Sequence, residues 1–214
     1  SNIYLSNIKD MGEREHFVWA RLYPNSTPVT WTYPFTLPSP TSSPAVLRIA
    51  FYGGSDLAAD PDHHLQVSLN GGLMDTPEAN IIFNGNNWYI AEIPVPAGLL
   101  RASPEENVLS VTDLLDLGVT LDIVFIDWIE LDYPNNFISQ ADKLQFSFPT
   151  VGTWRFPVSG FSSDQVQVYD LTTPSSPAII TGSTISGSDP YTAEFEATTS
   201  SSAAYWLGTD SALS

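Results

Sequence analysis

The chain has 214 residues and a formal net charge of −17, from 24 acidic and 7 basic side chains, which argues against binding to nucleic acids or anionic membrane surfaces. The absence of cysteine excludes disulfides, thiolate zinc sites and a cysteine nucleophile within these residues. No stretch approaches the roughly 20 consecutive apolar residues of a membrane-spanning helix, so we expect no membrane insertion.

Short runs rich in Val, Ile, Phe, Tyr and Trp are separated by Pro, Gly, Ser, Thr and Asn, a pattern that predicts an all-β protein. Pro34 predicts an edge strand or a bulge, and Asn70-Gly71-Gly72 predicts a tight turn. In chain order, the strands predicted in the first part are 13–23, 29–37, 45–52, 64–70, one or two within 79–93, 107–111 and 121–133.

The last of these segments, 121–133, reads LDIVFIDWIELDY and is expected to be a central strand of a sandwich. A strict period of two places one set of residues on one face: Ile123, Phe125, Asp127, Ile129, Leu131 and Tyr133. Asp127 interrupts this otherwise apolar face. A carboxylate there must be paired, hydrogen-bonded, protonated or metal-bound, because an isolated buried charge is too costly.

The run YPNNFISQADKL at 133–144 marks a change of unit. We therefore predict two domains, one over residues 1–138 and a smaller β-domain over residues 139–214. The strands predicted in the second domain are 144–148, 153–158, 165–169, 178–180, 191–197 and 203–207.

Two parts of the sequence resemble known protein families. The segments AVLRIAFYGGSD, HHLQVSLNG and FIDWIEL, within residues 15–137, resemble galactose-binding-like jelly rolls, which occur in carbohydrate-binding modules and in accessory domains of secreted bacterial enzymes. The run VGTWRFPVSGFSSDQVQVYDLTTPSSPAII at 151–180 is similar to the segment that precedes the catalytic domain in gingipain-like cysteine peptidases.

The resemblance implies a jelly-roll β-sandwich followed by a smaller β-sandwich domain. It also implies a secreted or cell-surface bacterial protein. Because the chain has no cysteine, we expect a non-catalytic accessory region of a larger gingipain-like peptidase rather than an enzyme. Its partner would be a peptidase domain downstream in the same protein. Two alternatives stay open, which are a carbohydrate-binding module and a structural or protein-interaction segment.

The resemblance also suggests a structural calcium ion. In several carbohydrate-binding jelly rolls the closing strand carries a similar Asp-x-x-Glu spacing, here Asp127 and Glu130, and further carboxylates near the N-terminus complete the site, here Glu13 and Glu15. On a regular strand Asp127 and Glu130 point to opposite faces, so a shared ion requires a bulge or an edge. The alternative is that Asp127 bonds to backbone amides or to an arginine such as Arg21 or Arg48.

Other polar residues offer less specific signals. The loop acids Asp56, Asp60 and Asp62 do not match an EF-hand spacing, and we interpret them as a solvated loop. His63 shares the apolar row of its strand and is expected to be a hydrogen-bonded core histidine, whereas His64 is expected to be exposed. No G-x-S-x-G motif or zinc-binding histidine spacing is present.

Aromatic side chains carry the hypothesis of glycan binding. A sugar ring stacks on a flat aromatic face, and the candidates for such stacking are Trp31, Tyr33, Trp88 and Tyr89. The alternative for these residues is packing in the core or between domains.

Overall fold

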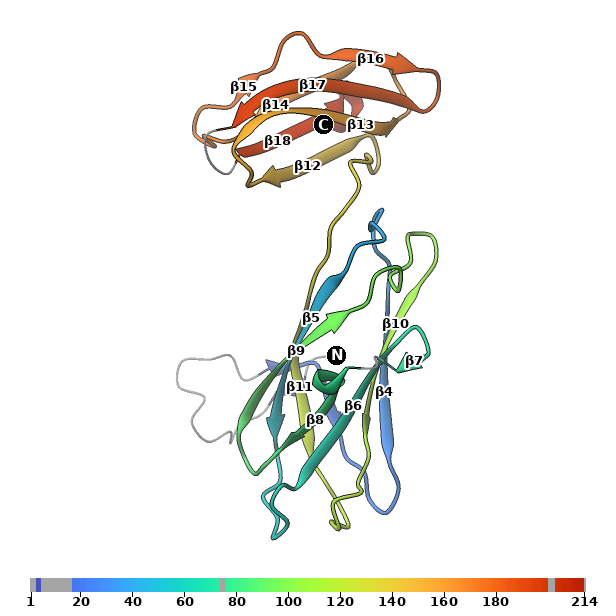
Figure 1. Cartoon of the computed structure of the whole chain (residues 1–214), viewed down its shortest axis with the longest axis vertical. Coiled ribbons are helices and arrows are strands. Elements are labelled where there is room, and N and C mark those ends of the chain that lie inside the picture. Colours follow the sequence, from blue (N-terminus) through green and yellow to red (C-terminus); the bar gives the residue numbers. More distant parts are fainter. Residues whose placement is uncertain (1–2, 5–16, 74–75, 200–202, 214) are drawn as a thin grey trace. The chain divides into compact units, whose positions relative to one another are not determined.

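The computed structural model describes residues 3–4, 17–73, 76–199 and 203–213. It confirms an all-β fold of antiparallel sheets (Figure 1), in which the described helices are the short 3-10 turns η1 (Pro77–Ala79) and η2 (Asp210–Leu213). No helix in these ranges is long and apolar enough to cross a membrane. The chain divides into unit 1, Ser1–Asn135, and unit 2, Asn136–Ser214.

Unit 1 contains two sheets with an apolar core between them. The first sheet has the order β4 (Val29–Phe35), β10 (Asn107–Asp113), β6 (His63–Leu69), β7 (Gly72–Leu73), and β8 (Asn80–Phe83) also pairs with β6. The second has the order β3 (Ala20–Leu22), β11 (Val124–Asp132), β5 (Ala45–Gly53), β9 (Trp88–Val95). β1 (Ile3–Tyr4) and β2 (Phe17–Val18) form a separate pair.

Alternation along the strands places the core as the sequence predicts. Leu65, Val67 and Leu69 of β6 are buried and interleave with half-buried polar residues, so their strand has one face toward the core. β4 pairs with β10 alone among the described strands, which confirms the edge position that Pro34 predicts. Asn70 and Gly71 both have positive φ angles, 56° and 77°, as a two-residue type I′ hairpin requires.

The predicted face of the central strand is right from Ile129 onward and wrong before it, because β11 contains a β-bulge. Its register against β5 shifts between Ile126 and Ile129, so the two residues in between lie opposite the single residue Ala50. Val124 and Ile126 face the core before the bulge, and Ile129 packs against it afterwards. Asp127 therefore lies at the bulge and is half-buried, not on a continuous apolar row.

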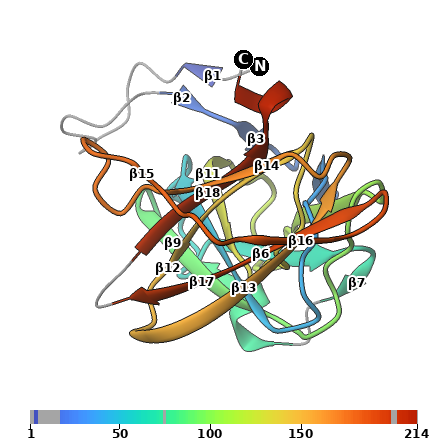
Figure 2. The same cartoon turned by 90° about the horizontal axis from the view of Figure 1, so that it is seen from above.

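Unit 2 is a second pair of sheets. One has the order β12 (Lys143–Phe148), β18 (Ala203–Thr209), β14 (Val166–Asp170), β15 (Ala178–Ile179). In the other, β17 (Tyr191–Thr199) lies between β13 (Gly152–Phe161) and β16 (Thr184–Gly187) (Figure 2). The core is aromatic and centres on the buried Phe156, whose ring lies 5.0–5.8 Å from five others. These five belong to Phe137, Phe146, Phe148, Phe195 and Tyr205.

Candidate functional site

The four aromatic residues predicted to bind a ligand lie in two separate pairs. Trp31 and Tyr33 are on β4, with their rings stacked 5.7 Å apart at 11°. Trp88 and Tyr89 are on β9, where they pack against Tyr52 and Phe83 respectively. β4 and β9 are edge strands of different sheets, and β4 contacts β3 whereas β9 contacts η1. The structure thus offers two aromatic pairs, not one shared binding face.

The predicted calcium ligands are only partly within the described residues. Asp127 lies at the bulge of β11, and Glu130 is exposed with its carboxylate 3.5 Å from Arg48. Glu13 and Glu15 lie outside the described ranges. Within those ranges no group of three His, Cys, Asp or Glu side chains is arranged to hold a metal ion. The calcium site stays a prediction.

Arg48 is the centre of a charged cluster on the outer face of the second sheet. Its guanidinium lies 2.9 Å from Glu92 and 2.5 Å from Asp132, in addition to the contact with Glu130. These three acids come from the strands on either side of β5. Hydrogen bonds to Asp132 and Glu92 raise the pKa of Arg48 further above its ordinary value. One cation therefore offsets the mutual repulsion of three neighbouring carboxylates.

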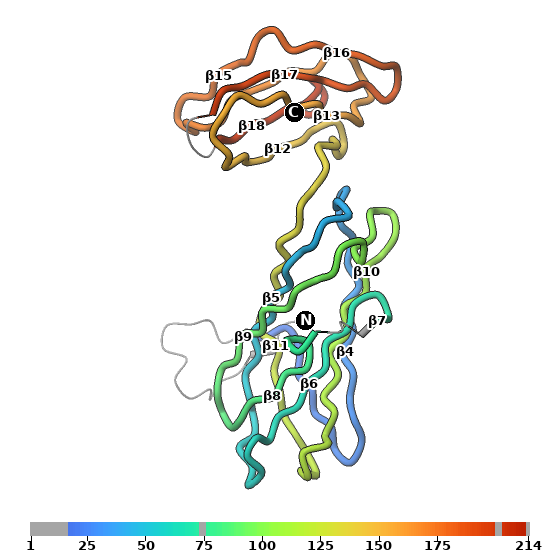
Figure 3. The backbone as a smooth tube through the Cα atoms, in the orientation of Figure 1, coloured from blue at the N-terminus to red at the C-terminus, as the bar shows by residue number. Residues whose placement is uncertain are grey.

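A buried polar network lies at one end of unit 1, where the β5–β6 and β10–β11 connections meet (Figure 3). The His63 ring is fully buried, with Nδ1 2.7 Å from Asp122 Oδ1 and Nε2 3.1 Å from the Gly85 carbonyl oxygen. Asp122 Oδ1 also accepts hydrogen bonds from the Ser55 hydroxyl and the Ile123 amide. Both ring nitrogens face acceptors, so the arrangement suits the doubly protonated, positively charged imidazolium.

The pKa of His63 agrees with this assignment. Burial is the largest single influence and acts to lower the pKa. The hydrogen bond to Asp122 and the charges of Asp122 and Asp62 act in the other direction, and together they hold the pKa above its ordinary value.

Asp113 completes the network from the end of β10. Its side chain is fully buried next to Asp122, and burial together with the charge of Asp122 raises its pKa to about 7. Neither oxygen of Asp113 has a hydrogen-bond partner of standard geometry among the described residues, nor does Asp122 Oδ2. A proton on Asp113 would supply the missing donor between the two carboxyl groups, since two bare carboxylates can only accept.

Two expectations about this region are wrong. Asp62 is buried rather than solvated, because its carboxylate accepts hydrogen bonds from the backbone amides of Leu57 and Gly85 and so closes the loop that carries it. His64 is half-buried rather than exposed, and its Nδ1 lies 2.7 Å from an Asp116 carboxylate oxygen. The expectation for His63, a hydrogen-bonded core histidine, is confirmed.

The geometry of the network suits a structural role, in which it holds loops and strand ends of unit 1 together. The Ser55 hydroxyl bonds to Asp122 and not to the imidazole, whereas nucleophilic catalysis by serine requires a contact with a base. The His63 ring is closed to solvent. The network instead connects the loop before β6, the loop before β9 and the ends of β10 and β11.

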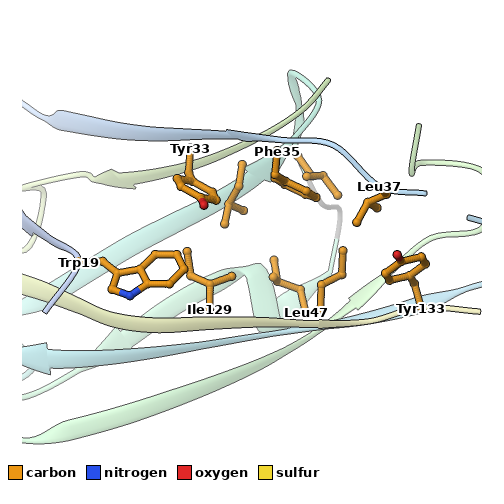
Figure 4. Close-up of a pocket in the computed structure, with 10 residues that line it drawn as sticks. Trp19, Tyr33, Phe35, Leu37, Leu47, Ile129 and Tyr133 are labelled. Atoms are coloured by element: carbon orange, nitrogen blue, oxygen red, sulfur yellow. The ribbon is translucent and has the colours of Figure 1, made fainter. Parts of the chain in front are cut away.

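An apolar pocket of about 170 Å³ lies elsewhere in unit 1, between β4 of one sheet and β5 and β11 of the other. Tyr33, Phe35 and Leu37 reach into it from one side, and Leu47 and Ile129 reach in from the opposite side (Figure 4). The complete lining is Trp19, Tyr33, Phe35, Leu37, Leu47, Leu69, Leu109, Ile129, Leu131 and Tyr133.

The sequence indicates only one of these ten lining residues, Tyr33, as a candidate for ligand binding. Trp19 and Tyr133 are 114 positions apart in the chain and reach the pocket only because β3, β4 and β11 are neighbours in the fold. The alternation of Tyr33 and Phe35 along an edge strand with a proline was a usable signal, because side chains two apart share a face.

Comparisons with known proteins give a likeness among the solved structures. No protein-family model matches this sequence. No curated protein matches it either. The fold is similar to the crystal structure of dimeric latent PorU from Porphyromonas gingivalis, with a TM-score of 0.52 and 13% sequence identity. The similarity covers 88% of this chain and 18% of the PorU chain, so this chain spans less than a fifth of PorU. At this identity the likeness concerns the fold alone.

The Arg48 cluster leads to a prediction about stability. Arg48→Gln should lower the melting temperature by a few degrees, because it leaves Glu92, Glu130 and Asp132 without their shared cation. The loss should shrink in 1 M salt, which screens the repulsion between exposed carboxylates. Thermal unfolding followed by circular dichroism at low and high salt would measure both effects.

Arg155→Gln is the matched control, since Arg155 is exposed and makes an ion pair through one contact of 3.5 Å with Glu194. Its effect on the melting temperature should be near zero. Equal losses for the two variants would contradict a special role for the Arg48 cluster.

The buried network leads to a prediction about pH. The raised pKa of Asp113 means that the folded state keeps a proton which an unfolded aspartate releases near pH 3.9. Its contribution to stability is therefore complete below about pH 4 and is lost as the pH rises through about 7. Asp113→Asn, which imitates the protonated acid, should gain stability relative to the unmodified protein by about 2–4 kcal/mol between pH 4 and pH 8.

Urea denaturation at pH 4, 6 and 8 would measure this gain. Glu105→Gln is the control, because it removes the same charge from an exposed position of unit 1 and should show no such trend. An Asp113→Asn variant whose stability relative to the unmodified protein is the same at all three pH values would refute the shared proton.

Proposed function

We propose that this chain is a non-catalytic accessory region of a larger secreted bacterial protein resembling the gingipain-like cysteine peptidases. In that protein it would support or position a peptidase domain that follows in the same polypeptide. Unit 1 would be the galactose-binding-like jelly roll and unit 2 the smaller β-sandwich that precedes the peptidase domain.

The observation that carries this proposal is the extent of the likeness to the crystal structure of latent PorU. The similarity covers 88% of this chain, which is more than either unit contains by itself. It therefore includes residues of both β-units. The sequence of unit 2 independently resembles the region upstream of a gingipain-like catalytic domain, and it supports the same proposal.

The first test is the reading frame of the gene that encodes this chain. It should continue beyond residue 214 into a peptidase domain with a histidine and a cysteine suited to catalysis. A frame that stops there, or that adds only further β-domains, would remove the basis for the accessory role.

A second test uses the full-length protein. Phe156→Ala removes the central ring of the unit 2 core and should lower the yield of folded, secreted peptidase if this region supports that domain. Arg155→Gln, the exposed neighbour on the same strand, is the control and should leave the yield unchanged. Full secretion and activity of the Phe156→Ala protein would contradict the proposal.

Carbohydrate binding is a second candidate function, favoured by the partly exposed rings of Tyr33 and Tyr89, at 38% and 36%. A sugar ring could stack on either tyrosine ring, and a glycan array probed with the full chain would detect this binding. Tyr89→Ala should then weaken binding at β9, whereas Ile90→Ala, the exposed neighbour of Tyr89, should not. The absence of binding to any glycan would exclude this candidate.

A further inference from the structure

We propose that the apolar pocket of unit 1 binds a small apolar molecule about the size of a single aromatic ring. This inference concerns a ligand site and is independent of the accessory role. The pocket has a volume of about 170 Å³ and walls from both sheets. An engineered cavity of about 150 Å³ lined by Leu, Ile and Phe stays dry and takes up benzene, which sets the size of the expected ligand.

The lining of the pocket offers a water molecule few hydrogen-bond partners. The lining side chains are hydrocarbon apart from the hydroxyls of Tyr33 and Tyr133 and the indole nitrogen of Trp19. A water molecule held inside a protein needs two to four polar partners, and an apolar cavity offers too few. Burial raises the pKa of the Tyr133 hydroxyl, which agrees with its placement in a poorly hydrated part of the pocket.

Among the described residues, the pocket lies between two strand edges that no further strand covers. β3 pairs with β11 only over Val124–Ile126, and among the described residues no strand pairs with the outer edge of Ile129–Asp132. β4, on the other side, pairs only with β10 in the described structure. The flank of the sandwich between β4 and the later half of β11 is therefore not closed by a described strand.

Two aromatic rings mark the mouth of the pocket. Trp19 and Tyr33 lie 5.4 Å apart, tilted by 48°, and each stays 38% exposed. Large apolar side chains that stay exposed beside a concave apolar surface are typical of binding sites. The floor is formed by Leu47, Leu69 and Leu109, which belong to the buried core, so the pocket reaches the interior of the sandwich.

The chemistry of the walls favours an apolar ligand over a sugar. A sugar stacks one apolar face on an aromatic ring, while its hydroxyl groups need hydrogen-bond partners around the rim. Here both opposing walls are apolar, and a sugar placed between them would lose the hydration of its hydroxyls without replacement. An aromatic or short branched hydrocarbon has no such loss.

Toluene and indole are suitable probes for the full chain. At ten times its dissociation constant, a bound probe should raise the melting temperature of unit 1 by about 3–5 °C. Methyl NMR should locate it, because a bound ring shifts the methyl resonances of Ile129. The methyl groups of Ile179, exposed in unit 2, serve as the internal control and should not shift.

Ile129→Phe and Leu131→Phe would each fill the pocket from its β11 wall and should reduce probe affinity at least tenfold. Ile90→Phe makes the same type of change at a residue that is 56% exposed on β9 and outside the pocket, and it should leave affinity unchanged. Two filling variants are used so that one misfolded protein does not decide the result.

Three outcomes would overturn the proposal. The first is no change in melting temperature or in the Ile129 methyl resonances at saturating toluene and indole. The second is an equal loss of affinity in Ile90→Phe and in the filling variants, which would place the probe elsewhere. The third is a preference for galactose or glucose over toluene at the Ile129 methyl groups, which would make the pocket a sugar site.

Discussion

The β-bulge between Ile126 and Ile129 determines which side chains of β11 face the core of unit 1 and which face outward. A regular strand would keep Val124, Ile126 and Glu130 on one face, and a buried glutamate without a partner would be costly. The additional residue reverses the alternation, so that Ile129 follows Ile126 into the core. Glu130 and Asp132 then lie on the outer face, where they meet Arg48.

The same bulge shapes the apolar pocket. Because Ile129, Leu131 and Tyr133 face inward after it, the later part of β11 forms one wall of the pocket. The covering strand β3 ends its pairing at Ile126, just before the bulge, and leaves this wall without a described partner strand. The bulge thus determines both which residues of β11 lie on the charged outer face of the sheet and which line the apolar cavity on its inner face.

Alternation predicted most of the fold from the sequence, because a strand with one buried face must repeat every two residues. The rows of β5 and β6 are examples, as is the hairpin at Asn70-Gly71, where both residues need positive φ angles. The bulge could not be predicted in this way, since an inserted residue leaves no mark in a pattern of apolar residues. β16, which reads TISG, was too short and too polar to be recognised.

The sites were harder to predict than the strands because they are made of residues far apart in the sequence. His63 was correctly placed in the core, since it shares a row with Leu65 and Val67. Its partner Asp122 is 59 positions away, and nothing in the local sequence indicates the contact. Asp62 looks like a loop acid, but two backbone amides and the charge of His63 make its burial favourable.

The likeness to PorU at 13% identity fits this view of the chain. The requirements of a sandwich are alternation, turn residues and a filled core, and very different sequences can meet them. A shared fold therefore carries little information about ligands. The features of this chain that bear on ligand binding at the pocket are local, namely an aromatic edge strand, a bulge opposite it and a cavity whose two walls are both apolar. Ligand binding at this pocket must be explained from these features, because they decide which molecules gain free energy by moving from water into it.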